Sequence, residues 1–209
     1  MPNAKRPESI GDVWTWVGLD SDSKLAISWL VGDRDAEAAG AFMWDVAARL
    51  ASRVQLTTDG HKPYLEAVAN AFHYDIDYAV LQKLYGTPPS DDARRYSPPV
   101  CIGARKEWVM GNPVKALVST SYVERSNLSL RMRCRRFTRL TNAFRKKLEH
   151  HAAAVALYFV HYNWCRPHQT LTKANRGIYK TPAIAAGLAD RVWTAADLIG
   201  LLELQRVAA

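Results

Sequence analysis

The sequence has few cysteines, no long apolar run and a central stretch without any acid. Its 209 residues include three cysteines, Cys101, Cys134 and Cys165, and no CxxC pair. Such a sparse, odd set excludes a disulfide-bonded scaffold and is typical of proteins from a reducing compartment. No stretch approaches the ~18 uncharged apolar residues of a membrane-spanning helix, so we expect no membrane-embedded segment. Residues 1–8 have no apolar core behind their charges, which excludes a secretory signal there.

The composition is that of an ordinary globular protein with an excess of positive charge. Apolar residues make up 48% of the chain and charged residues 23%. A chain of this length can bury a substantial core in one domain with an appendage. The formal net charge is +8 and the isoelectric point about 9.5. This excess predicts a polyanionic partner, nucleic acid above all.

The acid-free stretch runs from Arg125 to Lys147 and contains nine cations. They are Arg125, Arg131, Arg133, Arg135, Arg136, Arg139, Arg145, Lys146 and Lys147. A charge run is usually a solvated face, but nine cations without one balancing acid exceed what solubility requires. We therefore expect this stretch to contact the phosphates of DNA, without strong sequence preference.

Hydrophobic periodicity predicts strands first, then alternation of strands and helices, then helices. The predicted strands are 13–19 and 24–31, joined as a hairpin, 54–58 and 74–84. The predicted helices are 33–51, 63–72, a long helix from about 122, 152–164 (apolar nearly all round and buried), 182–189 and 195–204, with a turn at 166–168. Residues 86–113 are predicted to be mostly irregular. This order predicts an α/β fold with a mixed sheet flanked by helices.

Asp59 is the first candidate site residue. It ends a predicted strand and precedes Gly60, at the edge where open α/β sheets bind their ligands. The alternative is a turn or cap aspartate. If Pro63 is the first helical residue, the cap falls at Lys62, and Asp59 is too far upstream to cap. Both interpretations stay open from the residues alone.

Glu124 is the second candidate. Ser121-x-x-Glu124 has the pattern of a capping box, which by itself explains the glutamate. On a helix, the carboxylate would also share one face with a row of cations, where it could bind a metal ion while the arginines bind phosphates. That face contains Glu124, Leu128, Arg131, Arg135, Arg139 and Lys146. A zinc site at His161, Cys165 and His168 is disfavoured, because the spacing is unfamiliar and a fourth ligand is missing.

Taken together, several segments resemble bacterial insertion-sequence transposases of the IS-one type, which have a ribonuclease-H-like DDE core. The matching segments are 11–20 (GDVWTWVGLD), 31–35 (VGDRD), 57–64 (TTDGHKPY), 120–128 (TSYVERSNL), 135–142 (RRFTRLTN) and Tyr162-Asn163. They follow the order of the family between about residues 11 and 195. Each matching segment is weak evidence for the family by itself, whereas all of them together, in the family order, are specific for it.

The resemblance implies a ribonuclease-H-like core over residues 11–165, with an insertion at 86–113 and a helical C-terminal tail at 166–209. It implies that Asp59 is the second catalytic aspartate and Glu124 the catalytic glutamate. Both would bind Mg²⁺ (or Mn²⁺) for phosphoryl transfer between insertion-sequence ends and target DNA. The implied location is the bacterial cytoplasm at the nucleoid, as a homo-oligomer or paired with an intact transposase.

One departure from the family concerns the first aspartate. The family carries it in an Asp-Glu-x-Trp-like segment before the Trp-x-Trp strand, whereas residues 1–10 contain no aspartate. Asp20 is the tempting replacement, but it lies in the following hairpin turn. We therefore expect a transposase that lacks its first strand and N-terminal DNA-binding module, and that does not transpose by itself. The alternatives are a non-catalytic DNA-binding remnant and a ribonuclease-H-like nuclease.

Overall fold

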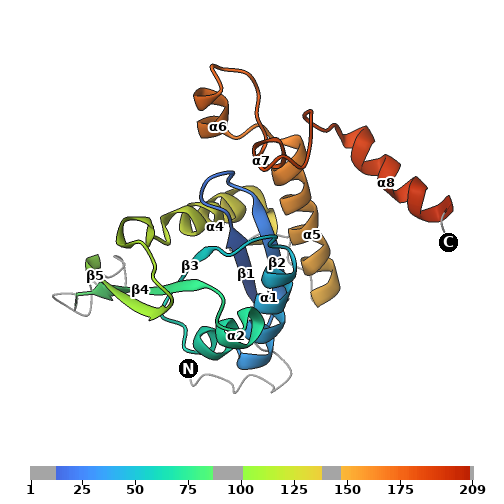
Figure 1. Ribbon diagram of the computed structural model, residues 1–209. Coiled ribbons are helices and arrows are strands. Elements are labelled where there is room, and N and C mark those ends of the chain that lie inside the picture. Colours follow the sequence, from blue (N-terminus) through green and yellow to red (C-terminus); the bar gives the residue numbers. More distant parts are fainter. Residues whose placement is uncertain (1–12, 87–100, 138–146, 208–209) are drawn as a thin grey trace, which may run out of the picture. The chain divides into compact units, whose positions relative to one another are not determined.

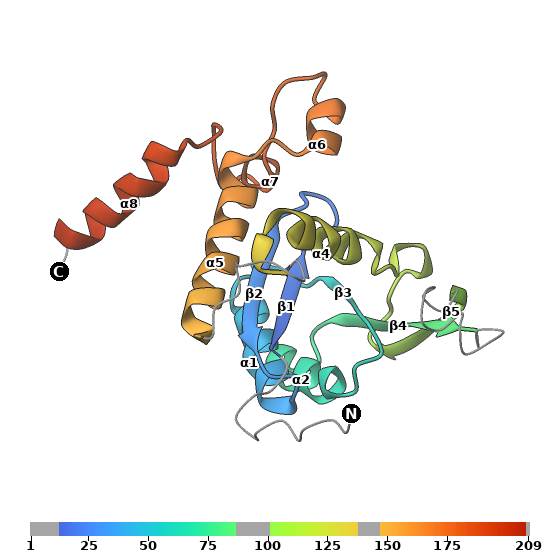
Figure 2. The same cartoon turned by 180° about the vertical axis from the view of Figure 1, so that it is seen from behind.

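The computed structural model of the protein describes residues 13–86, 101–137 and 147–207. The chain divides into two compact units, whose elements are shown in Figures 1 and 2. Unit 1 consists of Met1–Asp33 and Tyr122–Ala209, and unit 2 is the continuous segment Arg34–Ser121. Each unit has its own sheet and its own helices, which confirms the α/β class.

Unit 1 begins with the predicted hairpin. Strands β1 (Trp14–Leu19) and β2 (Ala26–Gly32) pair antiparallel as a two-stranded sheet. The turn between them closes through the Asp20 N–H, which donates to the carbonyl of Leu25 at 2.9 Å. Lys24 adopts a positive φ of 62° there, a conformation that lets the chain reverse within a few residues. The hairpin prediction is confirmed.

The helices of unit 1 differ from the prediction at the cationic stretch. They are α4 (Ser121–Arg133), a 3₁₀ turn (Arg135–Phe137), α5 (Leu148–Val160), α6 (Gln169–Ala174), α7 (Pro182–Ala185) and α8 (Ala195–Val207). The expected long helix is wrong, because α4 already ends at Arg133. The buried residues of α4 are Ser126 and Leu130. This buried stripe is too narrow to hold a longer helix against the sheet. Like charges four residues apart, as at Arg131 and Arg135, also disfavour continuation.

Helix α5 starts earlier than predicted and ends in a π-helical turn, His161–Cys165. One of its faces is buried at Val155 and Phe159, whereas Leu157 is 65% exposed, so the prediction of all-round burial is wrong. The short α6 was not predicted; the sequence suggested only a turn just before it. Among the described residues, no helix is long and apolar enough to cross a membrane.

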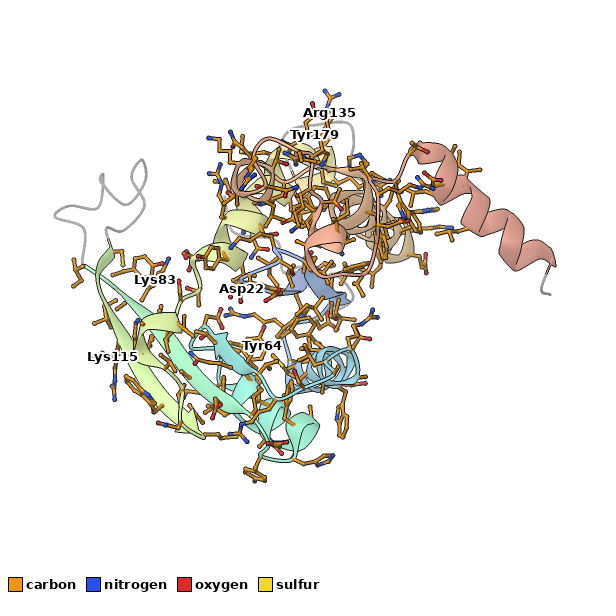
Figure 3. All side chains as sticks on the ribbon, turned by 45° about the horizontal axis from the view of Figure 1, so that its top comes forward. Asp22, Tyr64, Lys83, Lys115, Arg135 and Tyr179 are labelled. Atoms are coloured by element: carbon orange, nitrogen blue, oxygen red, sulfur yellow. The ribbon has the colours of Figure 1, made fainter. Side chains whose placement is uncertain are left out.

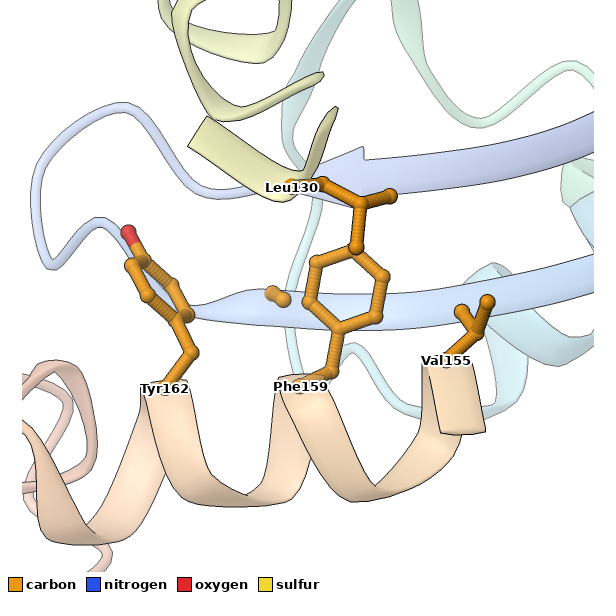
Figure 4. Packing of buried hydrophobic residues seen from close by; sticks show 5 residues of the cluster. Leu130, Val155, Phe159 and Tyr162 are labelled. Atoms are coloured by element: carbon orange, nitrogen blue, oxygen red, sulfur yellow. The ribbon is translucent and has the colours of Figure 1, made fainter. Parts of the chain in front are cut away.

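The core of unit 1 lies between the hairpin and the helices α4 and α5. It contains Ala26, Leu130, Val155, Phe159 and Tyr162, most of which Figure 4 labels. The ring of Phe159 stacks on Trp29 of β2, with centroids 5.1 Å apart. Ala26 lies more than a hundred residues before the other four core residues in sequence, so the core forms only when the two parts of unit 1 meet.

Asn163, in the π-helical turn, bonds directly to the hairpin. Its Oδ1 accepts a hydrogen bond from the Ala26 N–H at 3.0 Å, and its Nδ2 donates to the Ala26 carbonyl at 2.9 Å. Beside it, the Tyr162 hydroxyl donates to the Lys24 carbonyl at 2.9 Å. Asn163 is 5% exposed and Ala26 is 2% exposed, so water does not replace these bonds. The amide thus acts as a one-residue strand partner for β2.

Unit 2 contains a three-stranded mixed sheet in the order β3-β4-β5. Strand β3 (Gln55–Thr58) runs parallel to β4 (Asp77–Tyr85), and β5 (Cys101–Met110) runs antiparallel to β4. Helices α1 (Ala36–Ala48) and α2 (Pro63–Phe72) pack against each other. The predicted helix 63–72 is confirmed with the same bounds.

Strand β5 corrects the prediction that residues 86–113 are mostly irregular; residues 87–100 of that stretch lie outside the described residues. The strand is at the edge of the sheet and is exposed along most of its length. An edge strand of this kind shows no alternation of buried and exposed residues, so its sequence carries no period-two signal.

The Asn163 bonds predict a large loss of stability on truncation. In Asn163→Ala, the buried N–H and carbonyl of Ala26 lose their partners, which should reduce the free energy of unfolding by about 2–4 kcal/mol. Urea-induced unfolding at neutral pH measures this change. Asn112→Ala, at an exposed position in unit 2, is the matched control. Equal effects of the two substitutions would contradict the role of the Asn163 amide.

Candidate functional site

Asp59 lies immediately after β3, at the carboxyl end of the strand that pairs in parallel with β4. Its side chain is exposed, and its Oδ1 accepts a hydrogen bond from the His61 N–H at 3.1 Å. Helix α2 begins at Pro63 behind Lys62, whose side chain makes no capping hydrogen bond. Asp59 is therefore not the cap of α2. With the cap excluded, Asp59 is an exposed carboxylate whose hydrogen bond from the His61 N–H stabilises the turn.

The groups around Asp59 in unit 2 are mostly aromatic. Burial, followed by the charge of Asp59, raises the pKa of Tyr64 well above its ordinary value. Burial raises the pKa of Tyr78 to about 12; the hydrogen bond with Thr58 opposes this rise, and the charge of Asp59 adds to it. The Tyr78 hydroxyl also lies 2.7 Å from Thr58 Oγ1. Burial and then Arg34 lower the pKa of His61, which Asp59 opposes. Near neutral pH, both tyrosine hydroxyls are therefore protonated and add no second negative charge beside Asp59.

Glu124 lies in the first turn of α4 and is exposed. The helix begins at Ser121, so this serine is the first helical residue and not the cap, which corrects the capping-box prediction. Its Oγ lies 2.8 Å from Ser119 Oγ, just before the helix. The positive end of the helix dipole still favours a carboxylate at this position. Glu124 thus stands where an anion is stabilised and solvent can reach it.

Asp20 is held by its own turn. Its carboxylate accepts hydrogen bonds from the Ser23 N–H at 2.9 Å, from the Ser23 hydroxyl and from the Asp22 N–H at 3.3 Å. Burial by itself would raise the pKa of Asp20, but these bonds and the charge of Lys24 outweigh it, and the pKa is lowered. The turn alone explains an aspartate here.

A cation–π contact joins this hairpin turn to the start of α4. The Lys24 Nζ lies 3.7 Å from the ring centroid of Tyr122, two residues before Glu124. Asp20 and Glu124 therefore belong to adjoining segments of unit 1, whereas Asp59 belongs to unit 2. Within the described ranges, no group of three or more His, Cys, Asp or Glu side chains could hold a metal ion.

The disfavoured zinc site also finds no support among these residues. The ring of His168 packs edge-on against Tyr162, with centroids 6.3 Å apart. Cys165 Sγ lies 4.0 Å from the carbonyl of Thr194. Both contacts are those of ordinary packing at the end of a helix.

The cations of the acid-free stretch are mostly exposed. Arg125, Arg131, Arg133, Arg135 and Lys147 are exposed, and Figure 3 labels Arg135. Arg136 is half-buried and donates to the carbonyl of His150 at 2.5 Å. Arg139, Arg145 and Lys146 lie outside the described residues. Within α4, Glu124, Leu128 and Arg131 follow the predicted spacing of one face, but Arg135 lies beyond the helix.

Arg166 is a cationic residue that the sequence prediction missed. Burial and then the charge of Arg133 lower its pKa. Burial, Lys24 and Arg166 likewise lower the pKa of His168. The signal in the sequence was the second acid-free stretch, His150–Ala189, which contains Arg166.

Comparisons of this chain with known protein families, with curated proteins and with solved structures find no match.

The bonds to Asp20 predict a pH-dependent effect of Asp20→Asn. A carboxyl with a lowered pKa stabilises the folded chain above its ordinary pKa of 3.8 and loses that contribution as the pH falls through the folded-state value. Asp20→Asn should therefore lower the urea midpoint at neutral pH, and its difference from the wild type should shrink as the pH falls below 3.8. Asp22→Asn, at an exposed position of the same turn, is the control. A pH-independent difference would contradict the prediction.

Proposed function

We propose that this chain is the ribonuclease-H-like catalytic domain of a DDE-type DNA transposase, with resemblance to the IS-one type. The observation that carries the proposal is the cationic surface of α4. The helix opens with an exposed carboxylate, Glu124, and continues with exposed arginines and no further acid. DNA bound along the arginines of α4 would therefore have the Glu124 carboxylate beside it at the start of the helix.

The parallel strand pair of unit 2 supports the same proposal. Asp59 follows β3 at the edge where α/β sheets bind their ligands, and its carboxylate is exposed. The aspartate and the glutamate thus each occupy the kind of position that the family resemblance implies, one after a strand and one on a helix. The combination of a mixed sheet with helices is compatible with a ribonuclease-H-like fold.

The two carboxylates fit Mg²⁺ or Mn²⁺ by their chemistry, since hard cations prefer carboxylate oxygens. Asp59 in unit 2 and Glu124 in unit 1 are each a residue that would bind such an ion. When bound, the ions would stabilise negative charge on the phosphoryl oxygens and lower the pKa of the attacking hydroxyl. The role of the protein's own cations is to hold the DNA backbone, with Arg131 and Arg133 neutralising phosphates next to Glu124.

A non-catalytic DNA-binding protein is the second candidate. This candidate is favoured by Asp20, whose carboxylate accepts hydrogen bonds from Ser23 in its own turn. It also agrees with the finding that no three His, Cys, Asp or Glu side chains of the described residues form a metal-binding group. In this case, the cations of unit 1 would bind DNA, and Asp59 and Glu124 would be ordinary surface carboxylates. A ribonuclease-H-like nuclease would need the same carboxylates as the transposase, with water as the nucleophile.

DNA binding should depend on salt through individual arginines. Arg131→Gln should weaken duplex binding and lower the slope of log K against log salt by about one, because one phosphate contact is lost. Fluorescence anisotropy at several salt concentrations measures this slope. Arg49→Gln is the control, since Arg49 lies in unit 2 and is paired with Asp45 at 2.8 Å. Undetectable or salt-independent binding by the wild type would overturn both DNA-binding candidates.

Metal binding and strand transfer should both require the carboxylates. Asp59→Asn should abolish Mn²⁺ binding, measured by calorimetry, and leave the salt slope of duplex binding unchanged. With a pre-cut DNA end and Mn²⁺, any strand-transfer product should disappear in Asp59→Asn and in Glu124→Gln. Glu66→Gln, on an exposed residue of α2, is the control. Mn²⁺ binding that survives Asp59→Asn would contradict the catalytic proposal, and DNA binding without product in the wild type would favour the non-catalytic one.

A further inference from the structure

The loop between α6 and α7 holds two large apolar side chains in solvent. In this tip loop (residues 175–180), Ile178 is 68% exposed and Tyr179 is 71% exposed. Figure 3 shows Tyr179 among the side chains of unit 1. Adjacent exposed apolar side chains commonly mark a binding surface, because their burial by a partner is favourable.

The tip loop is held in one conformation by hydrogen bonds. The His168 N–H donates to the carbonyl of Lys180 at 2.9 Å and closes the base of the loop. The Gly177 N–H donates to the carbonyl of Thr172 at 2.9 Å, and Asn175 Nδ2 donates to the carbonyl of Ile178 at 3.2 Å. Gly177 has a positive φ of 86°, which glycine adopts without strain. A preformed loop loses little conformational entropy when its exposed side chains bind a partner.

The positive charge around the tip loop favours a polyanion as the partner of this loop. From Arg166 to Ala189 the chain contains no aspartate or glutamate, and Lys173 and Arg176 are exposed beside the apolar pair. An apolar pair surrounded by cations suits a nucleic acid, whose bases are flat and apolar and whose backbone is negative.

We propose that the tip loop binds DNA at an unpaired or unstacked base, with Tyr179 stacked on the base and Ile178 inserted beside it. Apolar side chains inserted between bases and aromatic rings stacked on unpaired bases are established ways of binding distorted DNA. Lys173 and Arg176 hold the flanking phosphates. The inference rests on the proposed function, because it gives the proposed DNA-binding protein a preference for DNA that is opened at one end.

The test compares two DNA probes of equal nucleotide content, a fully paired duplex and a fork with unpaired arms at one end. Anisotropy should show tighter binding of the fork by the wild type. Tyr179→Ala should weaken fork binding by about five- to a hundredfold and affect the duplex less, since one stacking contact is lost. Tyr179→Phe should keep the preference, because the ring stays. Tyr74→Ala, on a 72% exposed tyrosine in unit 2, should change neither affinity.

The outcomes separate this inference from the proposed function. Salt-dependent duplex binding with unchanged fork affinity in Tyr179→Ala overturns the inference and leaves the function intact. A change of sedimentation coefficient in Tyr179→Ala without a change in DNA affinity also overturns it, because the loop then contacts another protein chain. Lack of binding to both probes by the wild type overturns the function as well. Since Tyr179 is exposed, thermal melting should be equal for all variants.

Discussion

Two hydrogen bonds from one amide hold the two sequence segments of unit 1 together. Asn163 pairs with both backbone groups of Ala26, 137 residues earlier in the chain, and both residues are buried. The first bond satisfies an N–H and the second a carbonyl that water cannot reach, so neither can be lost without a cost in free energy. The π-helical turn at His161–Cys165 brings the amide to this position.

The same contact orders the candidate site of unit 1. Next to Asn163, the Tyr162 hydroxyl bonds to the Lys24 carbonyl, and the Lys24 ammonium lies over the ring of Tyr122. This chain of contacts runs from the end of α5 through the hairpin turn to the first turn of α4, which carries Glu124. The π-helical turn lies within the second acid-free segment, His150–Ala189. Packing of the core and placement of the charged groups are therefore coupled.

Much of the fold could be predicted from local pattern. The hairpin, the helix from Pro63 and the strand before Asp59 were predicted because period two, period 3.6 and the conformational restriction of proline act over a few residues. The edge strand β5 was missed because it depends on pairing with β4 and carries no period-two signal. The end of α4 at Arg133 was missed because burial, which is confined to Ser126 and Leu130 in this helix, is set by packing and not by periodicity.

The sequence by itself determined the chemistry of this protein: its excess of cations, two acid-free stretches and the carboxylates of Asp59 and Glu124. These follow from residue identity and charge. Only the tertiary structure decided that Asn163 pairs with Ala26, that Lys24 lies over the ring of Tyr122, and that Ile178 and Tyr179 remain in solvent. Each of these depends on distances through space, which packing sets and which spacing along the chain does not.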